Sequence, residues 1–295
     1  MSRRTWSETP TAQMLPDGRR LHLQHGPIDL VLEAFGEPEE VLKAYAQVQA
    51  VFPAILTGLT EELPRLRAAS GPPPAGPVAK TMWAATRPFA PEFITPMAAV
   101  AGSVADYVLS ILQSGRTLTR AYVNNGGDIA LFVRDGSFRI GICDDPAIGL
   151  SGGTVEIGPN DGVGGLATSG WRGRSHSLGI ADAVTVLARS AAEADAAATL
   201  IANKVDLPLS PKITRTPACE LSPDSDLEDR PVTTNVAELT PGETDAALQC
   251  GVDAAQHHLA TGRILAAYIA LSGERRVVFP QLHITTNEMR EAACA

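Results

Sequence analysis

Apolar residues recur at two spacings along this chain, and the spacing changes from strand-like to helical several times. Residues 21–34 (LHLQHGPIDLVLEA) alternate apolar and polar side chains in places, which predicts strands around a turn at Gly26–Pro27. Residues 38–69 carry valine, alanine and leucine at helical spacing and therefore predict helix. Pro53 lies inside this stretch and is expected to end or kink the first helix, because proline has no backbone N–H.

The ends of further helices are marked by specific residues. Residues 96–115 predict a helix of small side chains that stops at Gly115. Ser190, followed three residues later by a glutamate, predicts the start of an alanine-rich helix. Thr240, followed by a proline and then a glutamate, predicts a second capped start, and Gly262 predicts the end of that helix.

Turn residues separate the remaining apolar runs. Asp135–Gly136 stands between two alternating stretches and predicts a hairpin of the strands on either side. Residues 182–188 predict a strand, and the apolar runs around Ser272–Gly273 predict another hairpin. Residues 209–231 are polar and rich in proline, so we expect an ordered surface loop there.

These elements together predict an α+β fold with antiparallel hairpins and interleaved helices. A regular alternation of strand, helix and strand is absent from the pattern, which disfavours a doubly wound parallel sheet. We expect a flexible N-terminal segment over residues 1–20 and a single domain over residues 21–295.

The composition is that of a globular chain with an acidic balance. Hydrophobic residues make up 44% and charged residues 19% of the 295 residues, which is sufficient to bury a core. The net charge of −9 argues against general binding to nucleic acids or anionic membranes. The sequence has neither an apolar run near the ~20 residues of a membrane span nor the apolar stretch of a secretory signal. The expected location is therefore the cytoplasm.

The four cysteines are far apart in the sequence and lack the spacing of a metal site. Most are expected to be reduced and to fill apolar space. Cys143, which is followed by two aspartates, is the best candidate for a reactive thiol. A thiol-dependent role in sulfur metabolism that uses Cys143 is therefore one functional alternative.

A small, polar, glycine-rich stretch at 123–129 (VNNGGDI) is a first candidate ligand site. It has neither the glycine spacing of a dinucleotide fingerprint nor the lysine of a P-loop. One interpretation is a turn or bulge between strands. In the other, Gly126 and Gly127 expose their backbone N–H groups to a polar ligand, and Asn125 and Asp128 orient it by hydrogen bonds.

A second such stretch, GLATSG, contains Thr168, Ser169 and Gly170 and runs into WRGRSH. Arg172 and Arg174, together with His176, form either a solvated basic loop or a small cationic patch that suits phosphate or carboxylate. A serine near a histidine also raises the question of a hydrolase. The nucleophile-elbow pattern is not met, however, which disfavours a Ser–His–Asp hydrolase.

Asp195 and Thr199 are four residues apart on the helix predicted from Ser190, so their side chains share one face of it. That face is either simply solvated or part of a metal site. A carboxylate and a hydroxyl suit Mg²⁺, which uses few protein ligands and takes the others from substrate phosphates.

The order of several segments resembles that of ApbE, the FAD:protein FMN transferases. These segments are AYVNNGGDIALF, FRIGICDDP, GLATSG and ADAVTVLA, followed by AEADAAAT. The chain is most similar to a cytoplasmic sister branch described as thiamine biosynthesis ApbE-like, which shares LQHGPIDLVLEA, PMAAVAGSVAD and GLATSGWRGRSHSLGIADAVTVLA. The match to the branch covers nearly the whole chain, and the match to ApbE proper covers mainly residues 96–204. The resemblance implies a single ApbE-like domain of the T-fold type.

The resemblance also implies roles for individual residues. Asp195 and Thr199 match the magnesium ligands of the family, and a backbone carbonyl near Ala101 matches a third. Ser169 and His176 match a serine and a histidine that lie near the flavin. The chain departs from the family where AGS replaces AKG at the central helix, and where HSLGIAD replaces HIIDPRTG.

The reaction implied by the resemblance is attack by a protein threonine on the pyrophosphate of FAD, with Mg²⁺ stabilising the charge that develops on the phosphate. The expected cofactors are Mg²⁺ and FAD or FMN, and the expected partners are a flavin nucleotide and an acceptor protein, with a homo-oligomer left open. The alternative is a flavin-binding or regulatory protein that has kept the pocket without transfer chemistry.

Overall fold

An antiparallel sheet of nine strands runs through the computed structural model, which describes residues 9–145, 149–173 and 175–280. The order of the strands across the sheet is β1-β2-β3-β4-β5-β8-β9-β12-β13. The strands are β1 (Thr11–Met14), β2 (Leu21–His25), β3 (Ile28–Gly36), β4 (Leu118–Asn125), β5 (Asp128–Val133), β8 (Gly165–Ser169), β9 (Ala183–Ala188), β12 (Ala266–Leu271) and β13 (Glu274–Val278).

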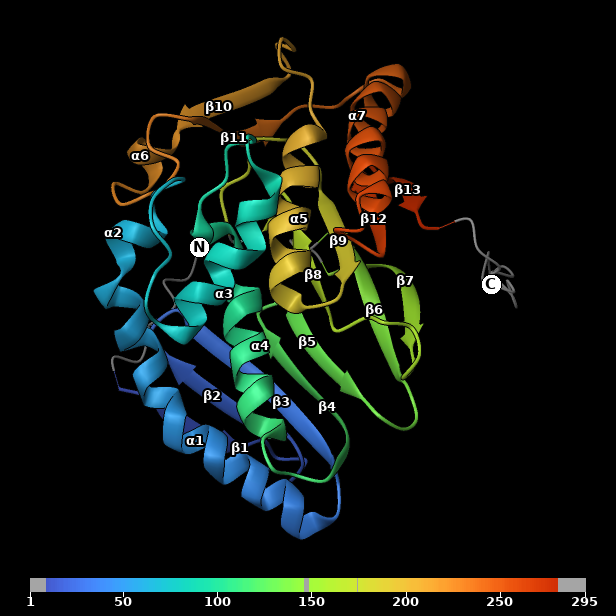
Figure 1. The fold of residues 1–295 in the computed structure, drawn as a ribbon. Helices are drawn as coiled ribbons and strands as arrows, with labels where there is room; N and C mark the ends of the chain where they lie inside the picture. Colours follow the sequence, from blue (N-terminus) through green and yellow to red (C-terminus); the bar gives the residue numbers. More distant parts are fainter. Residues whose placement is uncertain (1–8, 146–148, 174, 281–295) are drawn as a thin grey trace.

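The long helices cover one face of this sheet (Figure 1). They are α1 (Pro38–Glu61), α3 (Pro77–Thr86), α4 (Val100–Gln113), α5 (Ala191–Lys204) and α7 (Pro241–Ala260), and shorter ones are α2 (Leu63–Leu66), α6 (Ala218–Leu221) and the 3-10 turns Arg87–Phe89 and Pro96–Ala99. One core cluster joins α1 and α4 to β2–β5, and another joins α5 and α7 to β8, β9 and β12. The sheet and its helices therefore form two halves that meet between β5 and β8.

A separate hairpin packs on the opposite face of the sheet. It consists of β6 (Phe138–Asp145) and β7 (Leu150–Ile157), which pair only with each other among the described strands. Ala167 points into the helix-side core, whereas Leu166 beside it joins the cluster under β6 and β7. The middle strands are therefore apolar on both faces, because both faces are covered.

The α+β class is confirmed, as are two of the three antiparallel hairpins expected from the sequence. β2 and β3 form the hairpin around Gly26, and β12 and β13 form the one around Ser272–Gly273. α5 begins after Ser190, whose hydroxyl accepts a hydrogen bond from the N–H of Glu193. α7 begins at a complete capping box formed by Thr240 and its third helical residue.

Of the two outcomes expected at Pro53, the end of the helix does not occur, and the hairpin expected at Asp135–Gly136 does not form. α1 continues through Pro53 to Glu61, because Phe52, Ile55 and other apolar side chains on both sides of the proline remain buried in the same core. β5 and β6 do not pair across Asp135–Gly136; β5 pairs with β4 and β8 instead. Gly136 does change the direction of the chain, with φ +75°, but tertiary packing decides which strands pair.

Two expected loop segments contain strands. Within residues 209–231, β10 (Ile213–Pro217) is followed by α6, and β10 then pairs with β11 (Pro231–Val236) in a small sheet. Within residues 1–20, β1 pairs with β2. Asp17 organises the turn between them, since its carboxylate accepts the backbone N–H groups of Arg20 and Arg19, which hold its pKa well below the ordinary value. The folded part therefore begins before residue 21.

The segment 96–113, which ends with α4, is the central element of the fold. Its length and apolar composition would suffice to cross a membrane, but half of this stretch is buried inside the protein. Its buried residues, which include Val104, Val108 and Leu112, belong to the core shared with α1 and β2–β5. α4 ends at Gln113, with Ser114 as its C-cap, and Gly115 follows in the left-handed region with φ +67°, as expected for a helix stop.

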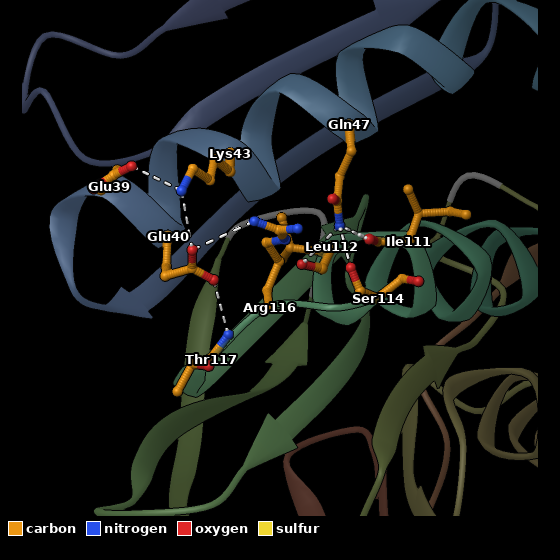
Figure 2. Close-up of polar contacts among 9 residues, drawn as sticks. All are labelled: Glu39, Glu40, Lys43, Gln47, Ile111, Leu112, Ser114, Arg116 and Thr117. Carbon is orange, nitrogen blue, oxygen red and sulfur yellow. Dashed lines mark hydrogen bonds and ion pairs between the residues drawn. The ribbon is translucent and has the colours of Figure 1, made fainter.

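Side chains of α1 hold the carboxyl end of α4 (Figure 2). The amide nitrogen of Gln47 donates to the carbonyls of Ile111, Leu112 and Ser114, the last at 3.2 Å. The Ile111 carbonyl also accepts the N–H of Ser114, whereas Gln47 is the donor to the carbonyls of Leu112 and Ser114. Gln47 therefore satisfies acceptors that the helix end would otherwise leave to solvent. Next to it, a hydrogen bond from the backbone N–H of Thr117 lowers the pKa of Glu40.

We expect Gln47→Ala to lower the free energy of unfolding by about 1–3 kcal/mol, because it leaves helix-end carbonyls without donors. The measurement is urea denaturation followed by circular dichroism. Gln49→Ala is the matched control, since Gln49 is exposed on the same helix, and it should stay within about 0.5 kcal/mol of the wild type. Equal effects of the two substitutions would show that the contact between α1 and α4 contributes nothing.

Candidate functional site

The first turns of α4 and α5 meet at Gly102 and cap each other. A Cβ on Gly102 would lie less than 3.0 Å from the backbone of Ala191, so only glycine permits this approach. Asp106 of α4 accepts the N–H groups of Ala191 and Ala192 at 3.0 and 2.9 Å. In return, Asp195 of α5 accepts the N–H of Gly102 at 3.0 Å. Each helix thus supplies a carboxylate to the positive end of the other.

The turn between β4 and β5 is attached to the same place. Asn125 and Asp128 face each other as the last pair of the two strands, and Gly126 and Gly127 form the turn with φ +67° and +119°. Both glycines therefore occupy a backbone region that favours glycine. The buried Asn125 amide donates to the carbonyl of Ala101 at 3.1 Å, which ties the turn to the start of α4.

The end of β8 completes the arrangement. The carboxylate of Asp128 accepts the backbone N–H of Thr168 at 3.3 Å, and the Thr168 hydroxyl lies 2.8 Å from that of Thr185 on β9. Asp128 also lies close enough to Asp195 for the two negative charges to interact. The structure thus brings residues 101, 125–128, 168 and 195 together, from the start of α4, the β4–β5 turn, β8 and α5.

Charges of one sign gather at this point. Burial raises the pKa of Asp195 well above its ordinary value, and the negative charges of Asp128 and Asp106 raise it further, while the N–H of Gly102 opposes the shift. Burial also raises the pKa of Asp106, against the two N–H groups that it accepts. The site can therefore retain a proton or take up a cation.

No cluster of three or more histidine, cysteine or acidic side chains that could chelate a metal occurs in the described part of the chain. A cation at Asp195 would therefore need other oxygens. The carbonyl of Ala101 is adjacent, since it shares the first turn of α4 with Gly102, and Thr199 lies one turn further along α5 and is partly exposed.

The remaining candidates of the GLATSG stretch lie at the end of β8. Ser169 is partly exposed and pairs in register with Val184 of β9. A Cβ on Gly170 would lie less than 3.0 Å from the backbone of Asp182, so this glycine permits close packing of two chain segments. Gly164 and Gly165 serve the same purpose against the backbone of residues 189–191. These glycines bring backbone close to backbone.

Arg172 is engaged by carboxylates. Its guanidinium lies 2.7 Å from Asp182 and 3.4 Å from Asp145, and it stacks over the ring of Trp171. The guanidinium is thus already neutralised, and it fixes the start of the loop that follows β8. Arg174 lies outside the described residues.

His176 is exposed, and within the described residues its side chain makes no hydrogen bond. The next residues are firmly held: the N–H of Leu178 donates to Asn203 of α5 at 2.9 Å, and the carbonyl of Ser177 accepts the N–H of Thr233 at 2.8 Å. The small β10–β11 sheet therefore anchors the segment that carries His176.

Cys143 is partly buried on β6, and both aspartates that follow it are occupied. Asp144 is buried, accepts the hydroxyl of Tyr268 and lies 2.7 Å from the guanidinium of Arg275. Burial raises the pKa of Tyr268, and the hydrogen bond to Asp144 adds to the shift. Asp145 pairs with Arg172. Neither aspartate is therefore a free base for the thiol.

Sequence reasoning missed two carboxylates that organise this region, Asp106 and Asp182. Asp106 could have been found, because it is the single charged residue of the apolar segment 96–113 and must have a buried partner. Asp182 accepts donors from Trp171, Arg172 and Ser272, which come from distant parts of the chain. No sequence pattern indicates that convergence.

We expect Gly102→Ala to lower the free energy of unfolding by about 2–3 kcal/mol or more, because the new methyl group would overlap the backbone of α5. Gly58→Ala is the control: Gly58 is also helical, a Cβ there meets nothing within 4 Å, and the change should stabilise by about 0.5–1 kcal/mol. Thermal denaturation of both variants checks this. A Gly102 variant as stable as the wild type would mean that the two helices are not in contact.

Comparison with known proteins identifies the family. The family model described as AbpE bacteria matches residues 12–277. UPF0280 proteins of Methanothrix thermoacetophila and Methanopyrus kandleri are 39% identical over 135 residues and 42% identical over 130 residues. These alignments cover 44% and 43% of this chain and 53% and 48% of the relatives, so the chain spans about half the length of the curated relatives it matches.

Solved structures give a more distant match. The apo flavinyl transferase ApbE of Pseudomonas stutzeri is 14% identical, with a TM-score of 0.43 and coverage of 92% of this chain and 94% of that one. The flavin transferase ApbE of Vibrio cholerae is 13% identical, with a TM-score of 0.44 and coverage of 91% and 96%. Because the family model matches most of the length of this chain, the chain belongs to the AbpE bacteria family.

Proposed function

We propose that the chain binds a flavin nucleotide with Mg²⁺ where α4, α5 and the β4–β5 turn meet, and that it is a divergent FAD:protein FMN transferase. The observation that carries the proposal is that two carboxylates and a carbonyl converge at the start of α4. Asp195 accepts the N–H of Gly102, and Asn125, which pairs in register with Asp128, donates to the Ala101 carbonyl. Burial raises the pKa of Asp195, and the charge of Asp128 raises it further. The resemblance to ApbE in the segments around residues 125–128, 165–170 and 195–199 supports the same site.

The residues fit a hard divalent cation. Mg²⁺ prefers oxygen ligands, uses one or two carboxylates and takes further oxygens from phosphates. Asp195 and Asp128 would supply the carboxylates, and the Ala101 carbonyl and the Thr199 hydroxyl would supply neutral oxygens. A cation there would also offset the repulsion between the two carboxylates, which adds to the raised pKa of Asp195.

Helix ends alone would not hold the pyrophosphate at this site. The N–H groups of Gly102, Ala191 and Ala192 already donate to protein carboxylates, so they are not available to a phosphate. We therefore infer that the carboxylates position the cation and that the cation in turn attracts the phosphates.

The proposed reaction transfers FMN from FAD to the acceptor protein and releases AMP. The hydroxyl oxygen of a threonine on the acceptor protein forms a bond to the FMN phosphorus, the phosphoanhydride bond breaks, AMP leaves, and the hydroxyl proton is released to a base. Bound Mg²⁺ would offset the charge that develops on the phosphates. Ser169 and the exposed His176 are the candidates to contact the flavin or to move this proton.

The first experiment measures ligand-dependent stability. FAD with Mg²⁺ should raise the Tm of the wild type, by an amount that corresponds to about 2.7 kcal/mol when the free ligand is at about 100 times its Kd. Asp195→Asn should remove this rise. Glu61→Gln, which neutralises an exposed carboxylate at the end of α1, should retain it. A wild-type Tm that does not respond to FAD and Mg²⁺ contradicts the proposed function.

The same substitution gives a pH signature without any ligand. The pKa of Asp195 is raised in the folded chain, so ionisation costs stability as the pH rises from the unfolded pKa through the folded one. Asp195→Asn removes that cost while an amide oxygen can still accept from Gly102. We expect the variant to have a Tm about 2–4 °C above the wild type near neutral pH, with a smaller difference in acid. An unchanged difference across pH would show that Asp195 carries no perturbed charge.

Transfer is tested separately from binding. Incubation with FAD, Mg²⁺ and a threonine-containing acceptor should release AMP and add the mass of FMN to the acceptor, as seen by mass spectrometry. Binding of FAD without AMP release, for every acceptor tried, would support instead a flavin-binding protein without transfer activity.

A further inference from the structure

A cavity of about 220 Å³ lies where α2, α3 and the segment before α4 come together. α2 and α3 are neighbours in the fold (Figure 1), and the lining comes from residues within 65–71, 83–90 and 92–96. Among the described residues, none that lines the cavity belongs to the candidate site around Gly102. Pockets for drug-sized ligands have volumes of roughly 300–1,000 Å³, so this cavity suits a smaller molecule.

Arg65 forms one wall of the cavity, and the backbone holds its guanidinium in place. Its nitrogens donate to the carbonyls of Ala68 at 2.8 Å, of Gly71 at 3.2 Å and of Pro72. Gly71 has φ +135°, so glycine lets the chain bend around the guanidinium there. The three contacts use three of the five N–H donors of the arginine. Arg65 is therefore fixed in position and can still donate to a ligand.

Arg87 provides a second positive charge on the α3 side. Its guanidinium lies 5.1 Å from the centre of the Trp83 ring, a cation–π contact that positions the group without neutralising it. Arg87 is exposed, whereas Trp83 is partly buried. The cavity thus combines a cation that a ligand can reach with an aromatic surface beside it.

The positive charges of the cavity are not balanced by acidic side chains. Within the described residues, neither Arg65 nor Arg87 forms an ion pair with a carboxylate. Glu92 is the one acidic residue among the described residues of the lining, and the ammonium of Lys204 lies 3.1 Å from it. Two guanidinium charges therefore remain at this place in a chain whose net charge is −9.

These charges decide which class of molecule fits. A neutral apolar molecule would displace water from guanidinium groups without replacing its hydrogen bonds, which is unfavourable. A cation would be repelled by both arginines. Carboxylates and phosphates, in contrast, accept parallel hydrogen bonds from the planar guanidinium group.

We propose that this cavity binds a small organic anion with a phosphate or carboxylate group on an apolar body, at a site separate from the proposed flavin site. The anionic group lies between Arg65 and Arg87, and the apolar body lies against Trp83 and Ile94, which is buried in the same wall. The ligand then contacts three segments of the chain at once, so its binding stabilises the folded protein.

The first test is calorimetric titration of the full chain with phenyl phosphate and with benzoate, which distinguish a phosphate ligand from a carboxylate ligand. At least one should bind in a ratio of one to one, and neutral benzyl alcohol should not bind. Arg87→Gln should weaken binding by about tenfold or more. Its Tm without ligand should match the wild type, because Arg87 is exposed.

Arg134→Gln is the matched control. Arg134 is also exposed and lies 5.6 Å from the ring of Phe132, but it does not line the cavity, so this variant should bind like the wild type. The proposal is overturned if neither anion binds. It is equally overturned if Arg87→Gln binds as tightly as the wild type, or if Arg134→Gln loses binding to the same extent.

The second test shows whether the two sites are separate. Asp195→Asn should bind the anion like the wild type, and FAD with Mg²⁺ should not compete with it. Arg87→Gln should retain any rise in Tm that FAD and Mg²⁺ produce. Competition by FAD, or loss of anion binding in Asp195→Asn, would place the anion in the flavin site and overturn the proposal. A chain that does not respond to FAD contradicts the proposed function alone and leaves the anion site intact.

Discussion

Two carboxylates, Asp106 and Asp195, fasten the halves of this protein together by capping each other's helix. β5 and β8, the strands at the boundary of the halves, pair over only two residues of each described strand, Ile129 with Leu166 and Ala130 with Gly165. The β6–β7 hairpin covers both of these strands on one face, and on the other face the halves are joined by the contact between α4 and α5. Its geometry depends on Gly102, because any larger residue would separate the helices.

Ionisation of Asp195 is electrostatically unfavourable at this same contact between α4 and α5. A carboxylate at a helix N-terminus is favourable, but burial and the approach of Asp128 oppose the ionised form of Asp195. A protein selected for stability alone would not need Asp128 so close to Asp195. Residues that lower stability in this way commonly belong to ligand-binding or catalytic sites. The proposed cation would ease this conflict, because its positive charge would favour the ionised form of Asp195.

The sequence predicted local features well, because they depend on neighbouring residues. Ser190 and Thr240 cap the helices that they were expected to begin, and the Gly126–Gly127 turn forms between the strands that flank it. Contacts between segments that are distant in the sequence, such as strand pairs and ion pairs, could not be predicted in the same way. Asp135–Gly136 is a turn whose strands pair elsewhere, since packing on the far face of the sheet outweighs the local hairpin preference. Arg172 was expected to be available to an anion, but Asp182 and Asp145 approach it from segments that no local pattern connects.

The short ladder between β5 and β8 is also a place where the sheet can open locally. Few backbone hydrogen bonds must break there, so amide exchange along this seam should be faster than along the longer ladders between β3 and β4 or between β8 and β9. Asp128 and Thr168 stand on its two sides and are joined by one hydrogen bond. A ligand that contacts both residues would therefore stabilise the closed seam, so that binding at this site and local opening of the sheet would oppose each other.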